Sequence, residues 1–379
     1  MKILIAIDSY KGTLESKQAG DIVKKAFLQV FGGIEIEVLS IADGGEGTVA
    51  AIMENNKGII RHSKVTGPLG EPVRAAYGIF GKTAVIEMAQ ASGLTLLQGR
   101  IPDPMNATTY GTGQLIKKAL DDGAQKIIIG IGGSATNDGG AGMAQALGVR
   151  FLDADGKELQ PGGAALEDLK EIDFSGLDDR IHGCEIIVAC DVKNPLCGPE
   201  GASFIYGPQK GATSGQVIKL DRALANFARI VYEATGNDYA GIPGAGAAGG
   251  LGFGLMAFCG GNLKPGIEIV LEASKLRNKI KNADLVITGE GCMDGQALNG
   301  KAPMGIAVAA NEFSVPVIAI AGQVKGGPDL MDKIGLDAAL ACVNRILTME
   351  EVRKEAENSL FYAALNAARL LKTGIKLKY

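Results

Sequence analysis

The sequence has few of the residues that build metal centres and disulfide frameworks. Its 379 residues include only two histidines, His62 and His182, and neither lies in a ligand or catalytic pattern. None of the six cysteines belongs to a C-x-x-C pair, and Cys190 and Cys197 are too far apart for the usual zinc spacing. These absences exclude a disulfide scaffold and a zinc knuckle, and they favour reduced thiols in a cytoplasmic enzyme.

Excess positive charge and long apolar helices are also missing. The net charge of −4 offers no polycation for a nucleic-acid backbone. The apolar N-terminal stretch ends at Asp8 with no cleavage site after it, which is not the pattern of a signal peptide. Residues 239–263 carry no charge, but their many glycines and Pro243 predict a buried loop leading into a packed helix, not a membrane span. We therefore expect neither nucleic acid nor a membrane as a partner.

Glycine, by contrast, is abundant, and it is concentrated in loops that follow apolar strands. The 55 glycines are about twice the average share of roughly 7%. After the apolar run 126–131, residues 132–140 read Gly-Gly-Ser-Ala-Thr-Asn-Asp-Gly-Gly, and a helix is predicted next. Such a loop can close backbone N–H groups around an anion. With the acidic loops 42–47 and 288–291, it predicts a site for phosphate together with a cation.

The order of the predicted elements indicates two α/β domains. Strands and helices alternate at both ends of the chain, with strands at 2–7, 35–41, 284–288, 315–321 and 338–343 and helices at 16–30, from 47, 303–311 and 349–372. The middle is mixed, with a hairpin at 73–80 and 83–88, helices at 110–121 and 140–147, and strands at 126–131 and 185–189. We predict a discontinuous, doubly wound parallel (Rossmann-like) domain, residues 1–66 and 283–379. Residues 67–282 form a mixed-sheet α/β insert, with the active-site cleft between the two domains.

Two short motifs leave alternatives open. Residues 130–135 satisfy G-x-G-x-x-A, and Asp153 lies where a ribose-binding acid is expected, which would suit a nicotinamide-dependent dehydrogenase of a small hydroxy acid. Residues 295–302 are close to a P-loop, but Ala302 stands where a hydroxyl should hold magnesium. Carboxylates such as Glu290 and Asp294 must then take that role. A sugar-acid sensor without catalysis is a third alternative.

Candidate chemistry-bearing side chains follow several of the strands. Asp8 and Lys11 come after the first strand, where open α/β sheets place ligands. Asp43 and Glu46 either cap a helix or bind magnesium. Asp191 follows strand 185–189 beside a lysine and an asparagine, so it is the best general-base candidate of the insert.

With these loops identified, the chain closely resembles the bacterial glycerate kinase family, which is distinct from the plant-type glycerate kinases. The matching motifs occur in the family's order over nearly the whole chain. They are residues 8–12, 42–48, 108–113, 132–140, 191–192 with 194–196, 244–250, 288–291 and 300–303. Cys292 departs from the family, which more often has arginine there.

This resemblance implies phosphorylation of D-glycerate by ATP with Mg²⁺, giving 2-phosphoglycerate, on two α/β domains. We expect Asp191, Lys11 and Lys301 to be catalytic and Asp43, Glu46, Glu290 and Asp294 to supply the metal ligands. We expect Asp8, Ser134, Asn137, Asp138 and Asn194 at the substrate, and Gly132, Gly133, Gly249, Gly250 and Gly300 at the nucleotide. The protein is expected to act as a monomer or homodimer.

Overall fold

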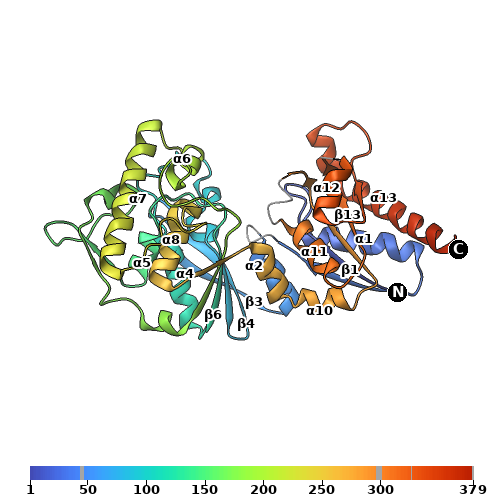
Figure 1. Cartoon of the computed structure of the whole chain (residues 1–379), viewed down its shortest axis with the longest axis horizontal. Coiled ribbons are helices and arrows are strands. Elements are labelled where there is room, and N and C mark those ends of the chain that lie inside the picture. The colour runs from blue at the N-terminus through green and yellow to red at the C-terminus, as the bar shows by residue number, and fades with distance from the viewer. Residues whose placement is uncertain (43–46, 296–300, 326, 378–379) are drawn as a thin grey trace. The chain divides into compact units, whose positions relative to one another are not determined.

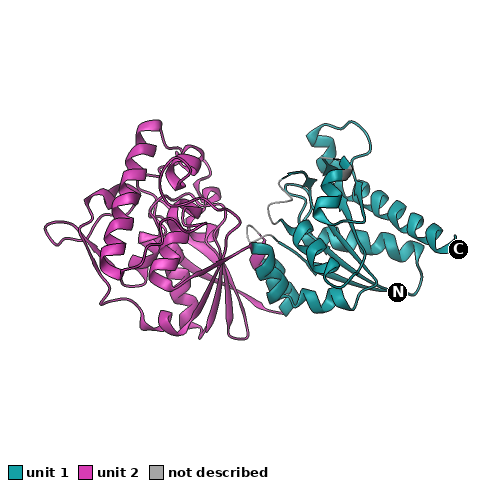
Figure 2. Ribbon diagram, viewed as in Figure 1, with its two compact units in different colours: residues 1–43, 50–56, 266–379 teal, residues 44–49, 57–265 magenta. Residues whose placement is uncertain are grey.

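The chain folds into two α/β units. The computed structural model describes residues 1–42, 47–295, 301–325 and 327–377. It divides into two compact units: unit 1 comprises residues 1–43, 50–56 and 266–379, and unit 2 comprises residues 44–49 and 57–265 (Figure 2). The chain therefore has the mixed α/β fold that the sequence predicts.

Unit 1 has the sheet order β15-β13-β11-β1-β2, and every neighbouring pair of these strands is parallel. Counted along unit 1, this is the doubly wound order 2-1-3-4-5, whose switch point lies between β1 and β11. The strands are β1 (Lys2–Ile7), β2 (Glu35–Ser40), β11 (Leu285–Gly289), β13 (Val317–Ala321) and β15 (Ala338–Ala341), with the short pair β12 (Cys292–Met293) and β14 (Gln323–Val324). The helices are α1 (Ser16–Val30), α2 (Thr48–Asn56), α9 (Gly266–Ala273), α10 (Leu276–Lys281), α11 (Ala302–Asn311), α12 (Gly327–Ile334) and α13 (Met349–Lys376). Figure 1 labels β1 and β13 of this sheet together with the helices α1, α11, α12 and α13 of the same unit.

The apolar character of β1 is explained by burial on both faces of this sheet. Ile3, Ile5 and Ile7 pack with α1 and α13, and the alternate residue Leu4 is also fully buried. A strand with both faces covered needs no polar alternation, which is why residues 3–7 read as a continuous apolar run.

Unit 2 has a six-stranded sheet in the order β10-β9-β6-β5-β4-β3, parallel from β10 to β5 and antiparallel at β4 and β3. Its strands are β3 (Ile59–Thr66), β4 (Pro72–Phe80), β5 (Thr83–Glu87), β6 (Lys126–Gly130), β9 (Glu185–Ala189) and β10 (Asn262–Lys264), with the small pair β7 (Arg150–Leu152) and β8 (Glu171–Asp173). Its helices are α3 (Ala89–Ser92), α4 (Tyr110–Asp121), α5 (Ala141–Ala146), α6 (Ala202–Tyr206), α7 (Ser214–Thr235) and α8 (Ala247–Cys259), and its 3-10 turns are η1 (Leu94–Leu97), η2 (Gly163–Asp168), η3 (Asp179–Gly183) and η4 (Pro208–Lys210).

The boundaries of the units differ from the predicted domain boundaries. The prediction placed residues 59–66 in the terminal domain, but β3 pairs along its whole length with β4 and so belongs to the sheet of unit 2. It also placed residues 266–282 in the insert. Instead, Arg277 of α10 bridges Glu268 of α9 and Glu312, which follows α11, and all three belong to unit 1.

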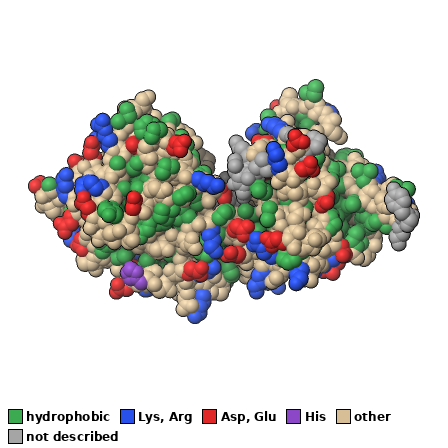
Figure 3. Space-filling model, in the orientation of Figure 1, with side chains coloured by type: hydrophobic (Ala, Val, Ile, Leu, Met, Phe, Trp, Pro, Cys, Tyr) green, Lys and Arg blue, Asp and Glu red, His purple; other side chains and the backbone are tan. Residues whose placement is uncertain are grey.

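The uncharged stretch 239–263 forms a loop and a packed helix, as predicted, but its loop is only partly buried. Residues 241–243 are exposed and residues 244–246 are buried. In α8, which follows, nearly all side chains are buried and the backbone leaves helical geometry at residues 248–250. In the described part of the chain, no helix is long and apolar enough to cross a membrane. On the face drawn in Figure 3, basic and acidic side chains are interspersed, and the coloured residues show no extended area of Lys and Arg alone.

Candidate active site

A pocket of about 740 Å³ opens at the carboxyl edge of the sheet in unit 1. Residues that directly follow β1, β11, β13 and β15 all line it, namely Asp8, Glu290, Gly322 and Cys342. The pocket therefore lies at the carboxyl ends of the strands and includes the switch point between β1 and β11. Open parallel sheets bind their ligands at this place.

Four side chains that the sequence singled out line this pocket together: Asp8, Lys11, Glu290 and Lys301. Asp8 is almost fully buried, and its Oδ1 accepts a hydrogen bond from the backbone N of Ser9 at 2.6 Å. Lys301 is the residue before α11, and its Nζ lies 3.8 Å from Oε2 of Glu290. The strand ends thus bring carboxylates and lysines from residues 8 to 301 into one hollow.

Tyr10 fixes the loop that carries Asp8 and Lys11. Its hydroxyl donates a hydrogen bond of 2.7 Å to the carbonyl of Ile320 in β13, and burial raises the pKa of Tyr10 well above its usual value. Gly289 lets the neighbouring strand approach, because a Cβ there would lie 1.9 Å from the carbonyl oxygen of the same Ile320. The positions of Asp8 and Glu290 are therefore set by packing across β1, β11 and β13.

The pocket could hold a magnesium ion with the carboxylates of Asp8 and Glu290. Mg²⁺ usually takes only one or two carboxylates and completes its shell with water and substrate phosphates, so this donor set fits. No cluster of three or more His, Cys, Asp or Glu side chains suited to a metal occurs among the described residues. Asp43 and Glu46, two of the predicted ligands, lie outside those residues. The fourth, Asp294, does not line the pocket, and its Oδ2 is 4.0 Å from Sγ of Cys292.

The polar loop after β6 in unit 2 is packed differently. Asp138 is fully buried, and its carboxylate accepts hydrogen bonds from N and Oγ1 of Thr109 at 2.7 and 2.8 Å and from N of Gly140 and Gly142 at 3.2 Å each. Burial raises the pKa of Asp138, although these four donors oppose the shift. Asn137 is also fully buried, and its Nδ2 donates to Oγ of Ser203 at 2.9 Å. This geometry favours a role for both residues in holding the loop.

The glycines predicted at the nucleotide also have packing roles. A Cβ on Gly249 would lie 2.0 Å from the carbonyl oxygen of Thr136, and one on Gly250 would lie 2.7 Å from Cα of Gly139. Both glycines also have positive φ, which suits glycine. The kinked segment of α8 therefore lies directly against the loop that carries Asp138. Gly132 and Gly133 remain exposed beyond the end of β6, and Gly300 lies outside the described residues.

Asp191 is exposed two residues after the end of β9. Because β6 and β9 are parallel, it lies at the same sheet edge as Gly132. Asn194 is held within its own loop, since its Nδ2 donates to the carbonyl of Glu200 and its Oδ1 accepts from the hydroxyl of Tyr206, both at 2.7 Å. Ser134 is buried and forms a backbone bridge with Gly93. Asp191 is therefore the predicted residue of unit 2 whose acidic side chain is open to solvent.

Three further polar residues of structural interest were not predicted from the sequence. Glu87 is buried at the end of β5, and its Oε1 accepts a hydrogen bond from the backbone N of Val49 at 2.8 Å. An acidic residue at the end of the apolar run 83–87 was the sequence signal that could have identified it. Lys325 lines the pocket of unit 1, just after β14. Lys210 is fully buried and donates from Nζ to the carbonyl of Thr136 at 2.7 Å. The residues next to Lys210 in the sequence give no indication that its side chain is buried.

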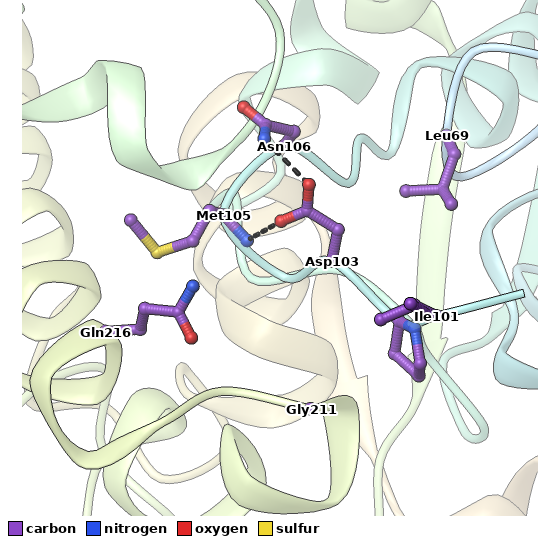
Figure 4. Close-up of a pocket in the computed structure, with 8 residues that line it drawn as sticks. Leu69, Ile101, Asp103, Met105, Asn106, Gly211 and Gln216 are labelled. Atoms are coloured by element: carbon purple, nitrogen blue, oxygen red, sulfur yellow. Dashed lines mark hydrogen bonds between the residues drawn. The ribbon is translucent and has the colours of Figure 1, made fainter.

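A second pocket, of about 660 Å³, lies in unit 2 and is drawn in Figure 4. Its one acidic side chain, Asp103, accepts hydrogen bonds from N of Met105 at 3.2 Å and from Nδ2 of Asn106 at 2.8 Å, both in its own turn. Ile101, on its rim, is 88% exposed. None of the predicted site residues lines this pocket, so it carries no part of the predicted chemistry.

The dinucleotide fingerprint at residues 130–135 does not have its expected surroundings. The fingerprint needs a helix that opens within the glycine motif, so that its N-terminus meets the pyrophosphate. Here β6 ends at Gly130 and α5 begins only at Ala141. Asp153 caps a turn through bonds from N of Asp155 and Lys157. This geometry does not support the dehydrogenase alternative.

Comparison with known proteins agrees with the geometry. The sequence model of the Glycerate kinase family matches residues 3–372. A glycerate kinase of Halalkalibacterium halodurans is 49% identical over 97% of each chain, and a glycerate 2-kinase of Escherichia coli is 48% identical over 99% of each. A solved structure from Salmonella typhimurium LT2, described provisionally as glycerate kinase 2, is 47% identical, covers 100% of both chains and superposes with a TM-score of 0.90. The chain belongs to the glycerate kinase family.

Proposed function

We propose that this protein transfers the terminal phosphoryl group of ATP to a hydroxyl of D-glycerate, giving 2-phosphoglycerate. The relatives of this chain are named for glycerate phosphorylation. The observation that carries the proposal is the meeting of two carboxylates and two lysines, far apart in sequence, in one pocket at the carboxyl edge of a parallel sheet. Phosphoryl transfer depends mainly on positioning and charge neutralisation, and this set of side chains supplies both.

Each of these side chains has a distinct task in the proposed reaction. Lys11 and Lys301 neutralise phosphate oxygens, and the ion pair between Lys301 and Glu290 keeps the lysine aimed into the pocket. Asp8 and Glu290 are the residues that would hold Mg²⁺, which would neutralise negative charge on the phosphates. Asp43 and Glu46 remain candidates for the same task.

Unit 2 supplies the acceptor side of the reaction in this proposal. Asp191 accepts the proton of the glycerate hydroxyl, because it is the exposed acid at the edge shared with the glycine-rich loop. Asp138 and Asn194 position that loop and its neighbour, since their side-chain polar atoms are already bonded within the protein. Asn137 is held through its Nδ2 and Ser134 through its backbone. A three-carbon acid offers little apolar area, so its recognition depends on charge and hydrogen bonds.

The cysteines support a cytoplasmic location. All six are free, and burial raises the pKa of Cys259 and Cys342 to about 12. Such thiols are unreactive and need no oxidising compartment.

A coupled assay of ADP release across small hydroxy acids, with and without Mg²⁺, tests the proposal. We expect release with ATP and D-glycerate and loss of release when EDTA removes the metal. Identifying the product by phosphorus NMR distinguishes the 2-phosphate from the 3-phosphate. Reduction of NAD⁺ by a hydroxy acid without ADP formation would contradict the proposal and restore the dehydrogenase alternative.

A further inference from the structure

Several apolar side chains line the pocket of unit 1, and the chemistry above does not use them. Met349, Val352 and Ala356 line it from one face of α13, at helical spacing. Val343 and Leu347, from the segment between β15 and α13, also line it. Met349 is 67% exposed although it lies on this apolar face. These side chains form a wall that the protein itself leaves only partly covered.

The start of α13 is built to hold this wall in place. Thr348 and Glu351 form a reciprocal capping box, in which Oγ1 of Thr348 accepts from N of Glu351 and the Glu351 carboxylate accepts from N of Thr348 at 2.7 Å. Further along the helix, Leu360 and Ala364 pack into the core with β1 and α1. The helix is thus fixed at both its start and its middle, and the wall between them is preorganised.

The apolar and the basic side chains of the lining together indicate the class of ligand. A pocket of about 740 Å³ is far larger than a three-carbon acid needs, and an apolar wall gives no favourable contact to a carboxylate or a phosphate. The pocket is also lined by Lys11, Lys301 and Lys325, which suit a polyanion. A ligand with a flat apolar end and a polyphosphate end suits both kinds of lining.

We propose that this pocket is the nucleotide site, with the purine base of ATP against Met349, Val352 and Leu347 and its phosphates toward Lys11 and Lys301. The inference rests on the proposed function and locates its nucleotide in unit 1. It replaces the expectation that Gly249 and Gly250 cradle the nucleotide, since backbone atoms of unit 2 already occupy the space beside those glycines. Aliphatic side chains bind the face of the base by dispersion and by exclusion of water.

Two matched pairs of variants test this site in the full chain. Met349→Glu adds a negative charge to the wall, and Leu370→Glu adds one to the same helix at a residue that is 68% exposed and lies outside the pocket. Val352→Trp fills the wall, and Leu370→Trp is its control. Binding of the fluorescent analogue N-methylanthraniloyl-ADP is measured by titration, and KM is measured separately for ATP and for D-glycerate. Circular dichroism and the urea midpoint check that each variant folds.

We expect Met349→Glu and Val352→Trp to weaken binding of the analogue and raise KM for ATP by tenfold or more, with KM for glycerate within twofold of wild type. Both Leu370 variants should bind as wild type does. If glycerate KM rises while the analogue still binds normally, the pocket belongs to the acceptor and the inference is overturned. The same holds if all variants bind like wild type and retain ADP release, in which case the proposed function stands. If wild type binds no nucleotide and releases no ADP, both the proposed function and the nucleotide site in unit 1 are refuted.

Discussion

The carboxyl edges of the two sheets look alike in sequence but use their polar residues in opposite ways. In unit 1, Asp8, Lys11, Glu290 and Lys301 line a pocket. In unit 2, the loop 134–140 turns its polar side chains into the protein, where Asp138 alone receives four hydrogen bonds. The same pattern of glycines and acids after an apolar strand therefore builds a ligand pocket in one unit and a rigid support in the other.

The glycines in or beside the two loops explain part of this difference. Gly249 and Gly250 meet backbone atoms of the loop at distances that no side chain allows, so the loop of unit 2 is clamped by α8. In unit 1, Gly289 is packed as tightly at the end of β11, but in the loop that carries Lys11 a Cβ on Gly12 would meet no atom within 4 Å. A buried carboxylate with every oxygen bonded stabilises its loop, whereas one that lines a pocket can also meet a ligand. Substitutions at both edges therefore test whether the two loops have these different roles.

The largest effect is expected at Asp191, the exposed acid of the supporting unit. Asp191→Asn keeps the shape of the side chain but removes its capacity to accept a proton, so kcat should fall by about 10²–10⁴. Glycerate KM should change little, and steady-state kinetics measures both constants. Asp153→Asn, in a turn of the same unit, is the control and should leave kcat unchanged. A near-normal kcat in Asp191→Asn would remove the base from unit 2 and restrict the chemistry to unit 1.

A smaller loss is expected when the pocket of unit 1 loses one positive charge. Lys301→Met removes the ion pair with Glu290 and one neutralising group, so kcat should fall by about 10²–10³. The exposed Lys281 of α10 lies outside the pocket, and Lys281→Met should behave as wild type. Arginine at position 301 should recover part of the rate, because it restores the charge with different geometry. If Lys301→Met affected only the urea midpoint, the lysine would be structural.

The sequence predicts the pocket better than it predicts the support, and the reason is physical. Asp8 and Glu290 directly follow short apolar strands, and parallel strands bring their carboxyl ends to one edge whatever lies between them in the chain. The partners of Asp138 and Gly249 are instead set by tertiary contacts, such as Thr109 with Asp138 and Thr136 with Gly249, which no local spacing encodes. Strand β3 escaped prediction because most of its side chains are exposed and it lacks an apolar face.

The clamp on the supporting loop is tested by Gly249→Ala. The new Cβ would lie 2.0 Å from the carbonyl oxygen of Thr136 at a residue with φ of 70°, so overpacking and backbone strain add to about 3 kcal/mol of lost stability. Gly156→Ala is the matched control, because Gly156 also has positive φ but its Cβ meets nothing within 4 Å. That variant should lose only about 1 kcal/mol. If urea unfolding showed the same loss of unfolding free energy in both variants, α8 would shift to make room for the new Cβ and would not hold the loop rigidly.

The smallest effect concerns Lys210, whose ammonium group is buried beneath the same loop. Burial lowers the pKa of Lys210 from 10.5 to about 7, although the charge of Asp138 opposes the shift. Between pH 7 and about 10.5 the unfolded chain therefore binds a proton that the folded chain has released. The free energy of unfolding of wild type should rise with pH across this window, by up to about 1.4 kcal/mol per pH unit from this group. Lys210→Met should lack that contribution.

Urea unfolding at pH 7, 8 and 9 measures the slope, and the exposed Lys281→Met variant is the control that should keep the slope of wild type. Lys210→Met also loses the hydrogen bond to the carbonyl of Thr136, but that loss shifts its stability by a constant amount and leaves the slope to report the titration. The slope is therefore the quantity that separates the two roles of this lysine. If wild type and Lys210→Met show the same slope, Lys210 keeps its proton in the folded protein. The support of unit 2 would then contain a buried ammonium charge near Asp138, and its likeness to the charged pocket of unit 1 would be closer than the packing indicates.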